Sequence, residues 1–107
     1  MDTLTISELL ETRAKITSDT DPALGKCQKA LTNLCCGDMP STLAFLRNDC
    51  TAEQFVLLSE LFDSIAEKSQ NRDFIAALRF LADKYPEAAR EHDLLPFIDF
   101  AEDCIYY

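Results

Sequence analysis

Residues 53–67 read EQFVLLSELFDSIAE, and the spacing of their apolar residues decides the class of fold. At about 100° per residue these side chains share one arc of a helix. The arc is made by Phe55, Leu58, Leu61, Phe62, Ile65 and Ala66. Just before it, Thr51 and Gln54 match a capping box, in which each side chain bonds the backbone N–H of the other residue. The stretch therefore predicts one amphipathic helix over residues 52–68.

Helix start and stop signals continue on both sides of this helix. Thr5 with Glu8 matches a second capping box. Residues that favour helix starts, and a glycine that favours a helix end, stand at Asp21, Asn71, Asp93 and Gly37. The further predicted helices cover residues 6–17, 22–36, 40–48, 72–85 and 94–106, with a helical turn or loop between the last two. No segment alternates with period two, so no strand is predicted.

The pattern as a whole predicts an all-α protein. The 107 residues fit a single helical domain, residues 1–107, and 48% hydrophobic content is typical of a globular chain. The short link between the helices over 52–68 and 72–85 favours their antiparallel pairing. We expect a compact bundle or short solenoid of about five to six helices in antiparallel hairpins. Phe62 and Leu78 should be core residues that face each other across the hairpin.

Two apolar faces give further expectations about packing. The inward face predicted for helix 94–106 contains Phe97, Phe100, Ala101, Cys104 and Ile105. Phe80 lies outside the apolar arc of helix 72–85, which predicts a middle helix packed on two sides.

The chain is strongly acidic, with 19 Asp and Glu against 10 Lys and Arg and a net charge of −9. Nucleic-acid binding depends on Lys and Arg that neutralise phosphates, so this composition argues against a DNA or RNA partner. It argues equally against an anionic membrane surface. A basic protein is the natural electrostatic complement. The alternative is that the acidity only keeps a small protein soluble.

The cysteines indicate a reducing compartment. Five cysteines, an odd number without a CxxC spacing, suit thiols that act as small core hydrophobes. Adjacent Cys35 and Cys36 would point about 100° apart on a helix and chelate poorly, so no metal site is predicted. Cys27 and Cys35 share an apolar arc, whereas Cys36 lies off it and is the candidate exposed, reactive thiol.

The remaining global signals favour a cytoplasmic, non-enzymatic protein. The first residues, MDTLTISELLETRAK, lack the apolar region of a signal peptide, and no run approaches the ~18 apolar residues of a membrane span. The only histidine, His92, lies in REHDL, and a GxSxG nucleophile motif is absent. Gly25 and Gly37 are the only glycines, which excludes a glycine-rich phosphate loop. We therefore predict no catalytic residues, no cofactor and no metal.

The strongest functional signal is a pair of acidic helix faces. On helix 52–68, Glu53, Glu60 and Glu67 repeat every seven residues, with Asp63 beside them and Val56 among them. On helix 94–106 an outer face gathers Asp99, Glu102, Asp103 and Tyr106. An apolar or aromatic group ringed by carboxylates is typical of a binding hot spot for a basic partner. The alternative is two ordinary solvated helix faces and a fraying C-terminal tyrosine.

Three segments within residues 45–87, NDCTAEQF, LSELFDSIAEKSQ and LRFLADKYPE, carry a family resemblance. This block covers about two-fifths of the chain and resembles small helical immunity proteins of bacterial toxin–immunity modules, notably of the contact-dependent growth inhibition type. The resemblance implies a cytoplasmic protein without enzymatic activity that binds one secreted toxin domain and blocks it. Toxins of such modules are often nucleases with basic clefts, which would suit the acidic faces.

The resemblance carries no fixed binding motif, so the predicted partner-binding residues are the nine of the two acidic faces. The protein is expected to be a monomer when unbound. An alternative from another class is a helical interaction or regulatory adaptor with a different basic partner. An immunity gene should lie directly downstream of a large toxin gene, and that neighbourhood would distinguish the two.

Overall fold

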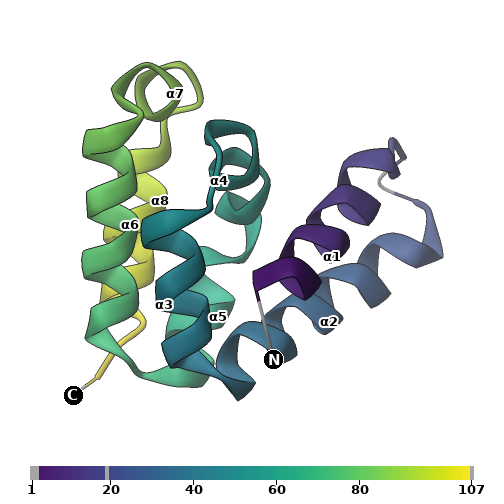
Figure 1. Ribbon diagram of the computed structural model, residues 1–107, viewed down its shortest axis with the longest axis horizontal. Coiled ribbons are helices and arrows are strands. Elements are labelled where there is room, and N and C mark those ends of the chain that lie inside the picture. Colours follow the sequence, from purple (N-terminus) through teal and green to yellow (C-terminus); the bar gives the residue numbers. More distant parts are fainter. Residues whose placement is uncertain (1–2, 19, 107) are drawn as a thin grey trace.

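The computed structural model describes residues 3–18 and 20–106, with side chains from residue 6 onward, and is helical along most of its length (Figure 1). Its elements are α1 (Thr3–Lys15), α2 (Pro22–Gly37), α3 (Met39–Asn48), α4 (Ala52–Leu58), the 3₁₀ turn η1 (Ser59–Leu61), α5 (Phe62–Ser69), α6 (Arg72–Lys84), α7 (Pro86–Glu91) and α8 (Leu94–Asp103). The described residues contain no strand, which confirms the all-α prediction. None of the described helices is long and apolar enough to cross a membrane.

Local hydrogen bonds explain where several helices begin. Asp21 Oδ1 accepts from the backbone N–H of Ala23 at 2.9 Å, and Asn71 caps α6 in the same way. The backbone N–H of Thr51 donates to Gln54 Oε1 at 2.9 Å, and that of Gln54 donates to Thr51 Oγ1 at 3.2 Å. These contacts satisfy N–H groups that a helix start leaves without partners. The caps predicted at these positions are confirmed.

Several helix bounds and one cap differ from those predicted, and α8 ends at Asp103 instead of residue 106. α1 begins at Thr3, ahead of the predicted cap at Thr5, whose side chain lies outside the described residues, and it ends at Lys15. Asp93 precedes α8 but makes no capping bond, because its backbone is left-handed with φ 53°. α7 forms where a turn or loop was equally expected, and Pro86 at its first position suits a helix start.

The helix predicted over residues 52–68 is broken in its middle. α4 ends at Leu58, η1 forms a tighter turn, and α5 starts at Phe62. Leu61 leaves the helical region, with φ −114° and ψ 1°, and Ser59 Oγ donates to the carbonyl of Val56 at 2.6 Å. A serine hydroxyl that bonds its own backbone competes with regular helical bonding. The apolar arc nevertheless holds, because all six of its residues are buried.

The arrangement of the helices brings α5 and α8 side by side (Figure 1). α1 and α2 form an antiparallel hairpin, but α5 and α6, despite their short link, share only a small contact. α5 packs chiefly against α8 and then α2, while α6 packs against α3 and α8. α5 and α8 run in the same direction. Near their starts, Asp63 and Phe97 line one hollow, and at their ends Gln70 donates to the carbonyl of Cys104. The main partner of α5 is therefore not the next helix in the chain.

The core is aromatic at its centre. Phe62 and Leu78 are fully buried, as predicted. Phe45, Phe55 and Phe74 are also fully buried, and the ring centroids of Phe55 and Phe62 lie 5.7 Å apart. Such a spacing is in the favourable range for aromatic pairs.

The inward face predicted for α8 is right at Ala101 and Ile105, which are buried, but wrong at its two phenylalanines. The fully buried residues of α8 are Leu94, Ile98 and Ala101. The predicted inward face included Phe97 and Phe100, which are in fact 49% and 57% exposed. α6 does pack on two sides, against α3 and α8, but Phe80 is not the residue that does so, because it is 45% exposed. The segment LLPFIDFAEDCI has apolar residues around most of its circumference, and its periodicity therefore does not select one face.

The contrast between Phe62 and Phe80 gives a test of the core. Phe62→Ala should lower the free energy of unfolding by ~3–5 kcal/mol, because it leaves a cavity. Phe80→Ala, the same change at a half-exposed site, should cost less than ~1 kcal/mol. Urea denaturation followed by far-UV circular dichroism measures both values. Equal losses for the two variants would contradict the assigned core.

Candidate protein-interaction surface

The structure distributes the nine predicted partner-binding residues over several places. Glu53 and Val56 lie on α4, and Glu60 lies in η1. The other six occupy α5, α8 and the segment after it: Asp63, Glu67, Asp99, Glu102, Asp103 and Tyr106. The break at η1 is one reason that the seven-residue repeat does not make a continuous stripe.

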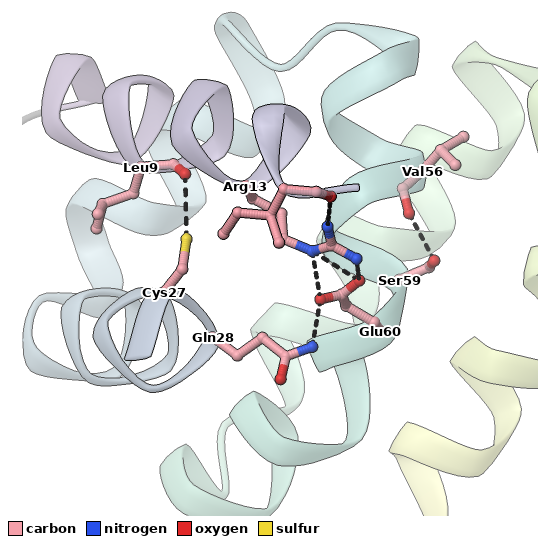
Figure 2. A network of polar contacts seen from close by, with 8 residues as sticks. Leu9, Arg13, Cys27, Gln28, Val56, Ser59 and Glu60 are labelled. Atoms are coloured by element: carbon pink, nitrogen blue, oxygen red, sulfur yellow. Dashed lines mark hydrogen bonds and ion pairs between the residues drawn. The ribbon is translucent and has the colours of Figure 1, made fainter. Parts of the chain in front are cut away.

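Glu60 is turned toward α1 and α2 instead of outward (Figure 2). Its carboxylate accepts from Arg13 Nη2 at 2.7 Å and from Arg13 Nε at 2.8 Å, and Gln28 Nε2 donates to it as well. Burial acts to raise the pKa of Glu60, but the hydrogen bonds from Arg13 and Gln28 outweigh it, and the net pKa is lowered. Two-donor pairing of this kind is among the stronger charged contacts in proteins. Glu60 therefore ties three segments together, which corrects its predicted place on an outward acidic face.

Glu53 and Val56 belong to a separate hollow. Its lining comes from α1, α4 and the α7 region: Ala14, Ala52, Glu53, Val56, Leu57, Ala88 and His92. Val56 is half-buried against the core, so it does not stand among carboxylates as predicted. His92 is exposed, and apart from Glu53 its neighbours in this hollow are apolar.

Three other acids lie near Cys104, where α5 meets α8. Burial raises the pKa of the Cys104 thiol, and the negative charges of Asp63, Glu67 and Asp103 raise it further. Asp103 precedes Cys104 in the chain, whereas Asp63 and Glu67 come from α5, so the packing of α5 on α8 places the charges of both helices within reach of this sulfur.

Two exposed phenylalanines continue this acidic group. Phe97 and Phe100 line a hollow with Ser59, Glu60 and Asp63, so they stand on the flank of α8 that faces α5. We name this surface the α5–α8 strip and define it by Asp63, Glu67, Phe97, Phe100, Asp103 and Tyr106. Sequence reasoning missed the two phenylalanines, because it placed them in the core.

Asp99 and Glu102 lie on the opposite flank of α8, toward α6. Arg79 Nη2 pairs with Asp99 at 3.1 Å and with Glu102 at 3.0 Å. These carboxylates are already partly neutralised, unlike those of the α5–α8 strip, for which no ion pair occurs within the described part of the chain. The acidic face predicted for the last helix is thus divided between two sides of α8.

Tyr106 ends the strip. Its side chain is 76% exposed, but its backbone N–H donates to Gln70 Oε1 at 2.8 Å. Gln70 Nε2 in turn donates to the carbonyl of Cys104 at 2.8 Å. The backbone at Tyr106 is therefore attached to the end of α5.

The thiols are not in a reactive state. The five cysteines are unpaired, and burial raises the pKa of Cys35 and of Cys50 to about 12. Cys36, predicted to be exposed, is half-buried and donates to the carbonyl of Ile65, and burial raises its pKa too. Thiolate formation controls cysteine chemistry, so these values disfavour nucleophilic roles at neutral pH. No three His, Cys, Asp or Glu side chains among the described residues are grouped so as to hold a metal ion.

No family model, curated protein or solved structure matches this chain. Its interpretation therefore depends on the geometry of the surface and on the resemblance of residues 45–87.

The Arg13–Glu60 contact predicts a pH-dependent contribution to stability. Because the folded-state pKa of Glu60 lies below the usual 4.5, its contribution is present above pH 4.5 and is lost as the pH falls through the lower folded-state value. At pH 7, Glu60→Gln should lower the free energy of unfolding by ~1–3 kcal/mol, because Arg13 and Gln28 lose a charged acceptor. Urea denaturation at pH 7 and in acid measures the difference from the wild type.

Glu67→Gln is the matched control, because it makes the same change at an exposed site. Its effect at pH 7 should stay within ~0.5 kcal/mol. A loss for Glu60→Gln that persists unchanged in acid, or that Glu67→Gln reproduces, would contradict the structural role of the Glu60 charge.

Proposed function

We propose that this protein is a non-enzymatic immunity protein that binds a basic toxin domain through the α5–α8 strip and neutralises it. The observation that carries the proposal is the exposure of Phe97 and Phe100 beside Asp63, for which no ion pair occurs among the described residues. Exposed large apolar side chains with a polar rim mark interaction sites on soluble proteins. The resemblance of residues 45–87 supports the toxin as the partner, and cytoplasmic location is part of the same proposal.

The chemistry of the strip favours a basic partner. Asp63, Glu67 and Asp103 would steer a positively charged domain toward the surface, because complementary charges raise association rates. Phe97 and Phe100 would then lose their contact with water, and buried aromatic anchors dominate interface affinity. A nuclease cleft has the required positive charge, since it must hold phosphates.

The opposite flank of α8 fits this role less well. Arg79 already engages Asp99 and Glu102, so a basic partner would have to compete with it. The flank facing α5 offers free carboxylates together with the two aromatic rings. We therefore assign docking to the α5–α8 strip and leave Asp99, Glu102, Glu53 and Val56 outside it.

The aromatic anchors give the first binding test. Phe100→Ala should weaken binding to the cognate toxin domain by ~2 kcal/mol or more, about 30-fold, mainly through faster dissociation. Phe80→Ala on α6 removes the same side chain from a half-exposed site outside the strip and should leave affinity unchanged. Surface plasmon resonance with the toxin domain encoded beside this gene measures both. Equal affinities for the two variants would place the docking surface elsewhere.

The strip acids give a second test, on rates. Changing Asp63 and Glu67 together to Lys should slow association markedly and weaken its dependence on salt. Folding stability should change little, because exposed charges contribute ~0–1 kcal/mol. Stopped-flow association at low and high salt, with cell protection assayed in parallel, provides the readout. Association by this variant as fast as by the wild type would show that the acids only confer solubility. Binding of a different basic protein, with no affinity for the toxin domain, would instead favour an adaptor.

A further inference from the structure

We infer that Gln70 is a positioning residue that holds Tyr106 in the α5–α8 strip before a partner arrives; the inference rests on the proposed function. Gln70 follows α5 in the chain, whereas Tyr106 follows α8. The two residues are 36 positions apart, yet a hydrogen bond joins them. The sequence patterns drew attention only to Tyr106, and Gln70 carries no signal of its own.

The side-chain amide of Gln70 is fully engaged. Its nitrogen donates to the carbonyl of Cys104 at 2.8 Å and to the carbonyl of Glu67 at 2.9 Å. Its oxygen accepts from the backbone N–H of Tyr106 at 2.8 Å. A primary amide offers two N–H donors and one carbonyl, so each group has a partner here. One side chain thus joins the last turn of α5 to the segment that leaves α8.

Gln70 bonds backbone groups at helix ends. The last carbonyl groups of a helix receive no hydrogen bond from within the helix, and Glu67 lies in the last turn of α5. Cys104 caps the end of α8, and Tyr106 lies beyond it. Gln70 thus supplies partners for all three groups, and among the described residues the backbone N–H of Tyr106 bonds only to its side chain.

The backbone of Gln70 indicates that its side chain is needed. Gln70 has φ 50° and ψ 36°, the left-handed conformation in which helices commonly end. Glycine adopts this conformation without the steric cost that a Cβ brings. A glutamine at such a site is unfavourable for the backbone alone, and its three side-chain hydrogen bonds offset that cost. Observed strain of this kind is a reason to look for a functional role.

The consequence for binding is preorganisation. The ring of Tyr106 is 76% exposed, while Ile105 beside it is buried and the Tyr106 backbone is held by Gln70. A side chain presented on a fixed backbone binds without the entropic cost of ordering the segment. Gln70 therefore acts on affinity through Tyr106, at the end of the strip opposite Phe97 and Phe100.

The first experiment needs no partner. In the full chain labelled with ¹⁵N, the amide order parameter of Tyr106 should be near ~0.85 in the wild type and fall below ~0.6 in Gln70→Ala. Gln70→Gly removes the same hydrogen bonds but relieves the left-handed backbone, so it keeps the test valid if Gln70→Ala folds poorly. Gln54→Ala, which loses a cap on α4 far along the chain, is the matched control and should leave Tyr106 rigid. An unchanged order parameter in both Gln70 variants overturns the inference.

The second experiment is a double-mutant cycle against the cognate toxin domain. Tyr106→Ala should weaken binding about 30-fold or more, as expected for a buried aromatic anchor. Gln70→Gly should weaken it about 3- to 10-fold in the wild-type background and have no further effect in the Tyr106→Ala background. The same fold-loss in both backgrounds means that Gln70 does not act through Tyr106, and this overturns the positioning role. If the wild-type protein does not bind the cognate toxin domain, the proposed function is overturned. The order parameter of Tyr106 still decides in that case whether Gln70 holds the segment.

Discussion

The buried contact between α5 and α8 is the constraint on which the candidate surface depends. The side chains that fix these two helices are fully buried: Phe62, Ile65, Ala66, Ile98 and Ala101. Rotation of either helix would expose several of them, at ~1.5–3 kcal/mol for each large side chain. Repulsion among exposed acids is weaker, ~0–1 kcal/mol for each pair. Hydrophobic burial therefore prevails and fixes α5, with Asp63 and Glu67, against α8, with Asp103.

The 3₁₀ turn at η1 controls what the acids of residues 52–68 can do. A continuous helix would place Glu53, Glu60 and Glu67 almost in line. The 3₁₀ turn changes the direction in which the side chain of Glu60 points. Its carboxylate accepts hydrogen bonds from Arg13 and Gln28 of the α1–α2 hairpin (Figure 2). One acid of the repeat thus supports the fold, and the other two lie in different surroundings. Because the helix is interrupted at η1, the residues of this regular repeat face different surroundings and have different roles.

The charge of the molecule is also unevenly distributed. α2 contains Lys26 and Lys29 and no acidic residue. Arg79 neutralises part of the flank of α8 that faces α6. The free negative charge next to exposed aromatic rings is therefore concentrated in the α5–α8 strip, and such local fields orient an approaching charged partner. The net charge of −9 alone does not contain this information.

The sequence by itself determined the helical class, the caps at Asp21, Thr51 and Asn71, and the core face of residues 55–66, because these depend on contacts within one or a few turns. It did not determine the inward face of α8, where apolar residues surround the helix and only the neighbours choose among them. The tertiary structure alone decided that α5 packs on α8, that Glu60 turns inward and that Gln70 reaches Tyr106. Each of these joins residues that are far apart in the chain, and a periodic pattern reports only on near neighbours.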